Sequence, residues 1–388
     1  MKHIKLVSIF FLSILLSGCW DSVELDESIM VVGIGVSKQD DEFNITIEAL
    51  TPSDISPTET AIEGKSTILQ AKSKTLFDAA REIIRIAKRR LFFTHAEVWV
   101  FQDDLAAEED MLQFLDILRR EQMLRLNSFL FISSEPPENI FMTDFTFSNI
   151  LSEELISGIE FSEYVSDYPA VRARDFFKRL LSPLRTGYLP AIKTIREDER
   201  VFSQLTGSAI FKKGKMVGSL DPRESFGLMW LNNEVHGGNI TVDLYDEEAA
   251  SFKLIRGDMD IKTQLNGNNL TVTINVKAEG ALADQNIYVE LMNKWVEKFK
   301  KKVSQSIEKD IYIALEKLQK DFKTDATLIG MNTYRKQPHQ FNQVKDNWDT
   351  IFSEATIHIN VDTTITNKGL IDSPGFHFQK KEWKNPHQ

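Results

Sequence analysis

Cysteine is almost absent from this sequence, which has one, Cys19, among 388 residues. A single thiol excludes an internal disulfide framework, and it also excludes zinc and iron–sulfur sites built from several cysteines. A long apolar segment is missing too, because the apolar run at residues 6–16 is shorter than the roughly 20 residues that span a bilayer. The chain has a formal net charge of −11 and no strongly basic block, which argues against nucleic-acid binding.

Recognisable catalytic motifs are also absent. The sequence contains no H-E-x-x-H, no G-x-S-x-G, no P-loop and no dinucleotide fingerprint. Its seven histidines are scattered singly, and we expect His95 and Glu97 to share one face of a strand over residues 94–101. A metal site needs more ligands than these two, so a structural role is favoured. We therefore predict a protein that is not an enzyme and has no metal, no cofactor and no catalytic residues.

The first 19 residues have the pattern of a secretory signal. Lys2 and Lys5 precede the apolar run, which ends in Leu16-Ser17-Gly18-Cys19. This ending resembles the bacterial lipobox, and the alternative, a buried helix with a stray cysteine, is disfavoured. The resemblance implies that residues 1–18 are cleaved and that Cys19 carries S-diacylglycerol and an N-acyl group such as palmitate. Several acyl chains together anchor a protein stably to a membrane.

Strands and helices alternate through the first 170 residues. Short β-rich runs predict strands, and apolar residues at helical spacing predict helices. The expected strands are 29–36, 43–47, 94–101 and 128–133, and the expected helices are 76–91 and about 111–125. In the first helix we expect Ile83 and Ile84 to face inward. Arg81, Arg85 and Arg89 line another face, for which solvent is favoured over lipid headgroups or a partner.

The second half begins with a predicted hairpin at 201–220, whose loop is Lys212-Lys213-Gly214-Lys215. Asp221, Pro222 and Glu224 have the pattern of a helix start with a capping box. An Asn266-Gly267 turn and a final strand at 356–365 follow. Between them we expect one helix of about 34 residues. Its apolar stripe is Leu291, Trp295, Phe299, Val303, Ile307, Ile311, Leu315, Leu318 and Phe322.

The spacing of that stripe restricts how the long helix can pack. Residues four apart drift by about 40° per step around a helix, so the stripe turns too far to rest on one flat sheet. We therefore expect one end to pack on its own sheet and the other on a middle domain or a partner. Phe299 and Ile311 sample the two ends.

Several segments of the sequence together resemble the Ger(x)C family, the lipoprotein C subunits of spore germinant receptors. The resemblance covers about residues 20–372. It includes Cys19-Trp20-Asp21 with the strand Val32-Gly33-Ile34-Gly35, Thr94-His95 after a basic helix, the hairpin from Gly207 to Leu220, the helix Leu228-Met229-Trp230-Leu231, and Leu318-Gln319-Lys320 followed by Trp348 and Phe352. One departure is the turn from Asp325 to Asn332, which lacks the phenylalanine and second glycine usual in the family.

The resemblance implies an α+β fold of three domains, each a β-sheet packed by helices, with one long helix in the C-terminal domain. We accordingly divide the chain into a cleaved signal peptide (1–18), an N-terminal α/β domain (19–197), a small middle domain (198–250), a C-terminal domain (251–373) and a polar tail (374–388). The resemblance also implies a complex with the membrane-embedded A and B subunits of a nutrient receptor, at the outer face of the spore inner membrane.

The sequence therefore predicts a lipid-anchored C subunit that acts in nutrient-triggered spore germination by protein–protein assembly. The alternative is a solute-binding lipoprotein of a transporter, which should show two lobes of repeated strand–helix units. A cell-envelope hydrolase is disfavoured by the missing catalytic motifs. Direct binding of a small-molecule germinant by this chain is left open.

Overall fold

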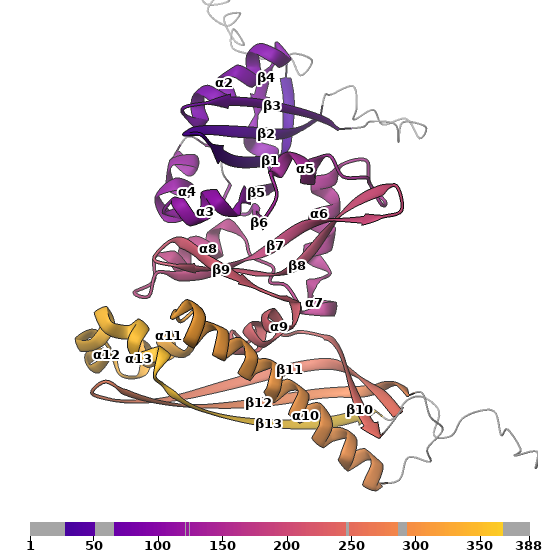
Figure 1. Cartoon of the computed structure of the whole chain (residues 1–388), viewed down its shortest axis with the longest axis vertical. Helices are drawn as coiled ribbons and strands as arrows, with labels where there is room; N and C mark the ends of the chain where they lie inside the picture. The colour runs from indigo at the N-terminus through magenta and orange to yellow at the C-terminus, as the bar shows by residue number, and fades with distance from the viewer. Residues whose placement is uncertain are drawn as a thin grey trace, which may run out of the picture.

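The computed structural model describes residues 28–50, 66–120, 122–123, 125–245, 248–285 and 293–367. Their strands form two β-sheets, which lie toward opposite ends of the long axis of the molecule with helices packed on each (Figure 1). The predicted α+β fold, with one long helix in the C-terminal half, is confirmed. In the described ranges, no helix combines the length and apolar character needed to cross a membrane.

The first sheet, sheet A, is mixed. Strands β1, β5, β6 and β7 run parallel in its centre, and antiparallel strands flank them in the order β3-β2-β1-β5-β6-β7-β8-β9, with β4 beside β1. Central strands are covered on both faces and therefore consist of nearly continuous apolar runs. The bounds are β1 (Ser28–Gln39), β2 (Glu42–Leu50), β3 (Thr67–Ser73), β4 (Arg90–Phe92), β5 (Val98–Gln102), β6 (Phe129–Ser133), β7 (Thr186–Glu197), β8 (Arg200–Lys212) and β9 (Lys215–Leu220).

Helices cover both faces of sheet A. Because side chains alternate along a strand, Val98 and Val100 of β5 pack with α5 and α6, whereas Trp99 and Phe101 pack with the helices of the other face. The bounds are α2 (Leu76–Ala87), α3 (Asp103–Glu108), α4 (Met111–Arg120), α5 (Pro137–Phe141), α6 (Leu151–Glu160), α7 (Ser162–Val165) and α8 (Ala173–Leu180), with a 3₁₀ turn η3 (Phe93–His95).

Strand pairing within sheet A is least extensive between β6 and β7. Only two residue pairs join them, Ile132 with Ala191 and Ser133 with Ile192. By contrast, β7 and β8 pair almost along their full lengths, from Thr186 with Lys212 to Glu197 with Arg200. The domain boundary expected at 197/198 falls in the turn of this hairpin, so strands assigned to the first two domains share one sheet. The division into three domains stays a prediction.

The second sheet, sheet B, has the order β10-β11-β12-β13. Strands β10 to β12 are antiparallel, and β13 returns parallel to β12 after the long helix. The bounds are β10 (Gly238–Tyr245), β11 (Glu248–Asn266), β12 (Asn269–Gln285) and β13 (Thr356–Asn367). The helical elements are α10 (Asn293–Glu316), the π-helical turn η4 (Lys317–Phe322), α11 (Ile329–Lys336), α12 (Pro338–Val344), the 3₁₀ turn η5 (Lys345–Asn347) and α13 (Trp348–Ser353).

Helix α9 (Pro222–Leu231) lies between the two sheets (Figure 1). The predicted start is confirmed: the Asp221 side chain accepts from the Glu224 amide, and the Glu224 carboxylate accepts from the Asp221 amide. A side chain at Gly227 would meet the Asp310 carbonyl oxygen at 2.1 Å, so glycine permits the close approach of α9 to α10. Arg223 also donates to the Asp310 carboxylate at 2.5 Å.

Several expected boundaries in the first half are wrong. The helix expected over 76–91 ends at Ala87, because Lys88 takes a left-handed conformation with φ of 55°. Ile84, expected inward, is 40% exposed. The strand expected from residue 94 begins only at Val98, after the turn η3, so His95 and Glu97 do not share a strand face.

The helix expected over about 111–125 also ends early, at Arg120. The later part of the chain agrees better with expectation. The hairpin over 201–220, the turn at Asn266-Gly267 and the last strand are confirmed. These elements have strict local patterns. The wrong boundaries lie where apolar residues keep the spacing of a helix or strand although the backbone has already left that conformation.

The long helix meets two different surfaces, as its drifting stripe predicted. Its described part is α10 followed directly by η4, which together span residues 293–322. Phe299 packs against Phe252 of sheet B, and the backbone of Asp310 touches α9. Phe299 and Ile311 are both fully buried within the chain, so the second surface is the middle segment rather than a partner.

A charged side chain at either end of this stripe should make the protein easier to unfold. We expect Phe299→Asp and Ile311→Asp each to cost at least about 3 kcal/mol, because each loses apolar burial and buries a carboxylate. Tyr312→Asp is the matched control, since Tyr312 is the next residue and is 58% exposed. Denaturant unfolding of the purified protein measures the difference. Equal stability of the Ile311 and Tyr312 variants would contradict the packing described here.

Candidate functional site

Cys19, the sequence-predicted lipidation site, lies outside the residues that the structure describes. Among the described residues, no group of three or more His, Cys, Asp and Glu side chains is placed to hold a metal ion. His358, Asn360 and Asp362 lie on β13 and are exposed, as the alternation of that strand predicts. The structure instead gathers buried polar groups where sheet A, α9 and the turn after η4 meet. We call this region the junction.

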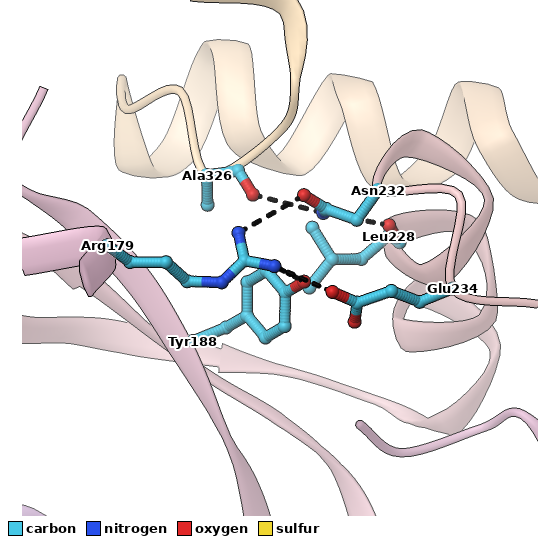
Figure 2. Close-up of polar contacts among 6 residues, drawn as sticks. All are labelled: Arg179, Tyr188, Leu228, Asn232, Glu234 and Ala326. Carbon is cyan, nitrogen blue, oxygen red and sulfur yellow. Dashed lines mark hydrogen bonds and ion pairs between the residues drawn. The ribbon is translucent and has the colours of Figure 1, made fainter. Parts of the chain in front are cut away.

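Arg179 connects three segments at the junction (Figure 2). It lies on α8, and its guanidinium donates to the Glu234 carboxylate at 2.7 Å, just after α9. It also donates to the Tyr188 hydroxyl on β7, and its plane lies over the Tyr188 ring, 4.2 Å from the ring centre. A longer bond of 3.4 Å reaches the Asn232 side chain. A guanidinium has enough donors for all three partners at once.

Tyr188 is completely buried beneath this guanidinium. Burial raises the pKa of its hydroxyl well above the usual value, although the nearby Arg179 charge acts in the opposite direction. Tyr188 therefore stays neutral, and its oxygen serves as an acceptor for Arg179. The negative charge that balances the guanidinium comes from Glu234.

Asn232 extends the junction into the C-terminal half. This residue ends α9, and its side-chain amide donates to the Leu228 carbonyl and to the Ala326 carbonyl, both at 3.1 Å (Figure 2). Next to Ala326, the Asp325 carbonyl accepts from the Thr186 hydroxyl of β7 at 2.7 Å. Strand β7 and the end of α9 thus each donate a hydrogen bond to one of two successive carbonyls in this turn.

The Asp325 side chain determines the conformation of that turn. It is fully buried, and its carboxylate accepts from the Thr327 amide at 3.0 Å, the Thr327 hydroxyl at 2.6 Å, the Gly330 amide at 2.7 Å and the Trp348 indole at 2.9 Å. Burial raises the pKa of the Asp325 carboxyl, and these four bonds act in the opposite direction.

Gly330 is the residue of this turn that must lack a side chain. A side chain at Gly330 would lie 2.6 Å from an Asp325 carboxylate oxygen and 2.8 Å from the Trp348 indole nitrogen. This glycine therefore leaves room for both groups while its own amide completes the set of donors.

A cavity of about 270 Å³ opens beside the junction. Lys178, Arg179, Glu234 and Arg335 contribute charges to its wall, and Leu184, Leu328 and Met331 contribute apolar surface. Arg179 and Glu234 in this wall are bonded to each other and so connect α8 with the segment after α9.

Sequence reasoning identified the Asp-containing turn and Trp348 but missed Arg179, Tyr188, Asn232 and Glu234. Arg179 and Glu234 are 55 residues apart, and they belong to segments without a shared pattern. A local pattern can show that a helix ends near Asn232, but it does not show which distant residue the Asn232 side chain contacts.

Comparisons with known proteins match nearly the whole chain. The family model "Spore germination protein N-terminal domain" matches residues 21–194, and "Spore germination B3/ GerAC like, C-terminal" matches residues 206–369. Spore germination protein KC of Bacillus subtilis (strain 168) is 24% identical, over 94% of this chain and 95% of that protein. Spore germination protein B3 of the same organism is also 24% identical, over 95% of this chain and 98% of its own length.

A solved structure shares the fold. It is titled "Crystal Structure of the GerBC protein", and it superposes with a TM-score of 0.59 over 89% of this chain and 100% of that chain. Its sequence identity is 19%, so the similarity concerns the fold alone. The two family models meet between residues 194 and 206, within the hairpin of β7 and β8.

Replacing the buried carboxylate by its amide should destabilise the protein. In Asp325→Asn, one side-chain oxygen becomes an NH₂ group that faces amide or indole donors, so we expect a loss of about 2–4 kcal/mol. Asp321→Asn is the control, because Asp321 is exposed and forms a surface pair with Lys317, worth at most about 1 kcal/mol. Denaturant midpoints of the two variants measure this contrast, and an unchanged midpoint for Asp325→Asn would rule out the role given to the carboxylate.

Proposed function

The chain belongs to the Ger(x)C family of spore germination proteins, and from this membership we propose that it is the lipid-anchored C subunit of a nutrient germinant receptor. The observation that carries the proposal is the end-to-end match: two family models follow each other in order, and whole-length relatives are named spore germination proteins. The fold shared with the GerBC structure supports it.

We propose that the subunit works by assembly and not by catalysis. Its partners would be the membrane-embedded A and B subunits, and its place would be the outer face of the spore inner membrane. In the described part of the chain, Arg179 is bonded to Glu234 and to Asn232, and Asn232 is bonded to the turn after η4, an arrangement suited to holding a shape. A lipid anchor would confine this shape to the membrane and so raise its effective concentration near the partners.

The alternative, a solute-binding lipoprotein of a transporter, fits the structure less well. Such a protein was expected to have two lobes of repeated strand–helix units with parallel sheets. The described strands instead form two mixed sheets, one with nine strands and one with four, each containing antiparallel hairpins. Neither family model is that of a transporter component.

Lipidation is tested by removing the one cysteine. Cys19→Ala should abolish incorporation of labelled fatty acid, because no other thiol exists in the chain. The variant should then leave the membrane fraction unless its partners retain it. Ser22→Ala, which changes a nearby residue and keeps the thiol, should be labelled like the wild type. Fatty-acid label on the Cys19→Ala protein would disprove the anchor.

Assembly is tested by recovery of the complex. From spore membranes dissolved in a mild detergent, we expect this protein to be purified together with the A and B subunits. Asp325→Asn should lower the recovered amount in proportion to its loss of folded protein, whereas Asp321→Asn should not. If the A and B subunits are recovered together while this chain is consistently absent, the proposed subunit role is wrong.

A further inference from the structure

Helix α2 has apolar residues on its buried side and also beside it, on a surface about a third of a turn away. One side packs on sheet A through Ala79, Ala80 and Ile83, which are buried. On the second surface, Phe77 is 46% exposed and Ile84 is 40% exposed. The periodicity of the sequence had assigned Ile84 to the core, and its exposure leaves an apolar surface that the described residues do not cover.

Basic side chains lie among these exposed apolar residues. Positions 77, 81, 84 and 88 follow each other at helical spacing, so Arg81 and Lys88 lie in the same row as Phe77 and Ile84. The Arg81 guanidinium lies over the Phe77 ring, 4.4 Å from its centre. Arg85 is next to this row and is also exposed. We call these five residues the α2 surface.

The charge of this segment is opposite to that of the protein. Residues 76–92 contain five Lys and Arg but two Asp and Glu, giving 5 − 2 = +3, in a chain whose formal net charge is −11. The two acidic residues have local partners: Asp78 is bonded to Thr75 at the helix start, and Glu82 pairs with Arg85. A helix that presents apolar and basic side chains together suits the interface of an anionic bilayer.

The chain enters the fold beside this surface. Ser28, the first described residue, is paired with Arg90 of β4, two residues after Lys88. Figure 1 shows α2 and β4 together at one end of the long axis, with sheet B toward the other end. Eight residues lie between Cys19 and Ser28, so the nine steps from one to the other reach at most about 32 Å. An anchor at Cys19 therefore keeps this end of the molecule close to the bilayer.

We propose that the α2 surface docks on an anionic lipid bilayer, with Phe77 and Ile84 at the headgroup boundary and Arg81, Arg85 and Lys88 against lipid phosphates. The proposal rests on the proposed lipidation of Cys19, which supplies the nearness. Docking fixes which end of the protein faces the membrane and leaves sheet B on the far side. A lipid anchor without docking would limit only the distance between the protein and the bilayer and would leave the orientation of the protein open.

The position of α2 can be measured on the full lipidated protein in vesicles. Cys19 is the one native cysteine and is occupied by the anchor, so Ile84→Cys supplies a single thiol for an environment-sensitive fluorophore. In vesicles of phosphatidylcholine with phosphatidylglycerol, spin-labelled acyl chains should quench this fluorophore. They should leave a fluorophore at Tyr312→Cys, an exposed position on α10, unquenched. Vesicles of phosphatidylcholine alone should quench the Ile84 label less.

Charge variants test the electrostatic part. Each Lys or Arg near an anionic surface contributes about 1 kcal/mol, or about fivefold, so replacing Arg81, Arg85 and Lys88 together with Gln should lower the docking constant about 100-fold. The matched control replaces Lys294, Lys301 and Lys302 with Gln, which removes the same charge from exposed positions on α10 and should leave quenching unchanged.

The remaining outcomes show whether the docking surface fails alone or together with the lipid anchor. Protein that stays on the vesicles while the Ile84 label is unquenched overturns the docking surface and leaves the anchor intact. Protein that fails to associate with the vesicles at all overturns both. Shielding of the Ile84 label only when the membrane subunits are present, on neutral and anionic vesicles alike, would assign the α2 surface to a protein partner and overturn the proposal.

Discussion

A carboxylate without access to water needs hydrogen-bond donors on all sides, and Asp325 obtains its four from the C-terminal half of the chain. Those bonds fix the turn from Asp325 to Gly330, and the fixed turn presents the carbonyls of Asp325 and Ala326 to Thr186 and Asn232. The orientation of the two halves therefore depends on a side chain whose hydrogen bonds all lie within one of them. Arg179 and Glu234 add a second connection in the same place.

Helix α9 carries the contact between the two sheets. Its residues from Leu228 to Leu231 are all buried, because sheet A, sheet B and α10 surround it. This last part of α9 has no solvent face and is apolar all round, whereas the exposed first turn holds Arg223 and Glu224. Gly227 removes the one side chain that would separate α9 from α10. The molecule is thus joined by backbone contact as well as by the polar bonds of the junction.

Much of the fold could be predicted because its causes are local. The capping box at Asp221 involves neighbouring residues, and the alternation of β13 is visible within one strand. Other features depend on residues far apart in sequence. Glu48 of β2 accepts from the amides of Leu151 and Ser152 at the start of α6, more than 100 residues later. No single-segment pattern predicts such a pair.

The errors have a similar origin. Ile84 has the spacing of a core residue, but Ala79, Ala80 and Ile83 already fill the contact of α2 with the sheet, so Ile84 lies outside it. At the junction, the sequence identified Asp325 and Trp348 because they belong to recognisable segments, and it missed Arg179 and Glu234 because folding alone brings them together. To predict exposed apolar residues or ion pairs between distant segments, one must know which surfaces other parts of the chain already cover.

The place of β13 at the outer side of sheet B has a consequence for the order of folding. Its pairing with β12 joins residues about 85 positions apart, from Thr271 with Thr356 onward, so this contact must close a long loop. Until then β12 has an open edge, and an open edge with regular alternation can pair with a strand from another molecule. Strand β13 therefore covers the long edge of β12, and it can do so only after the helices between the two strands, from α10 to α13, have been synthesised.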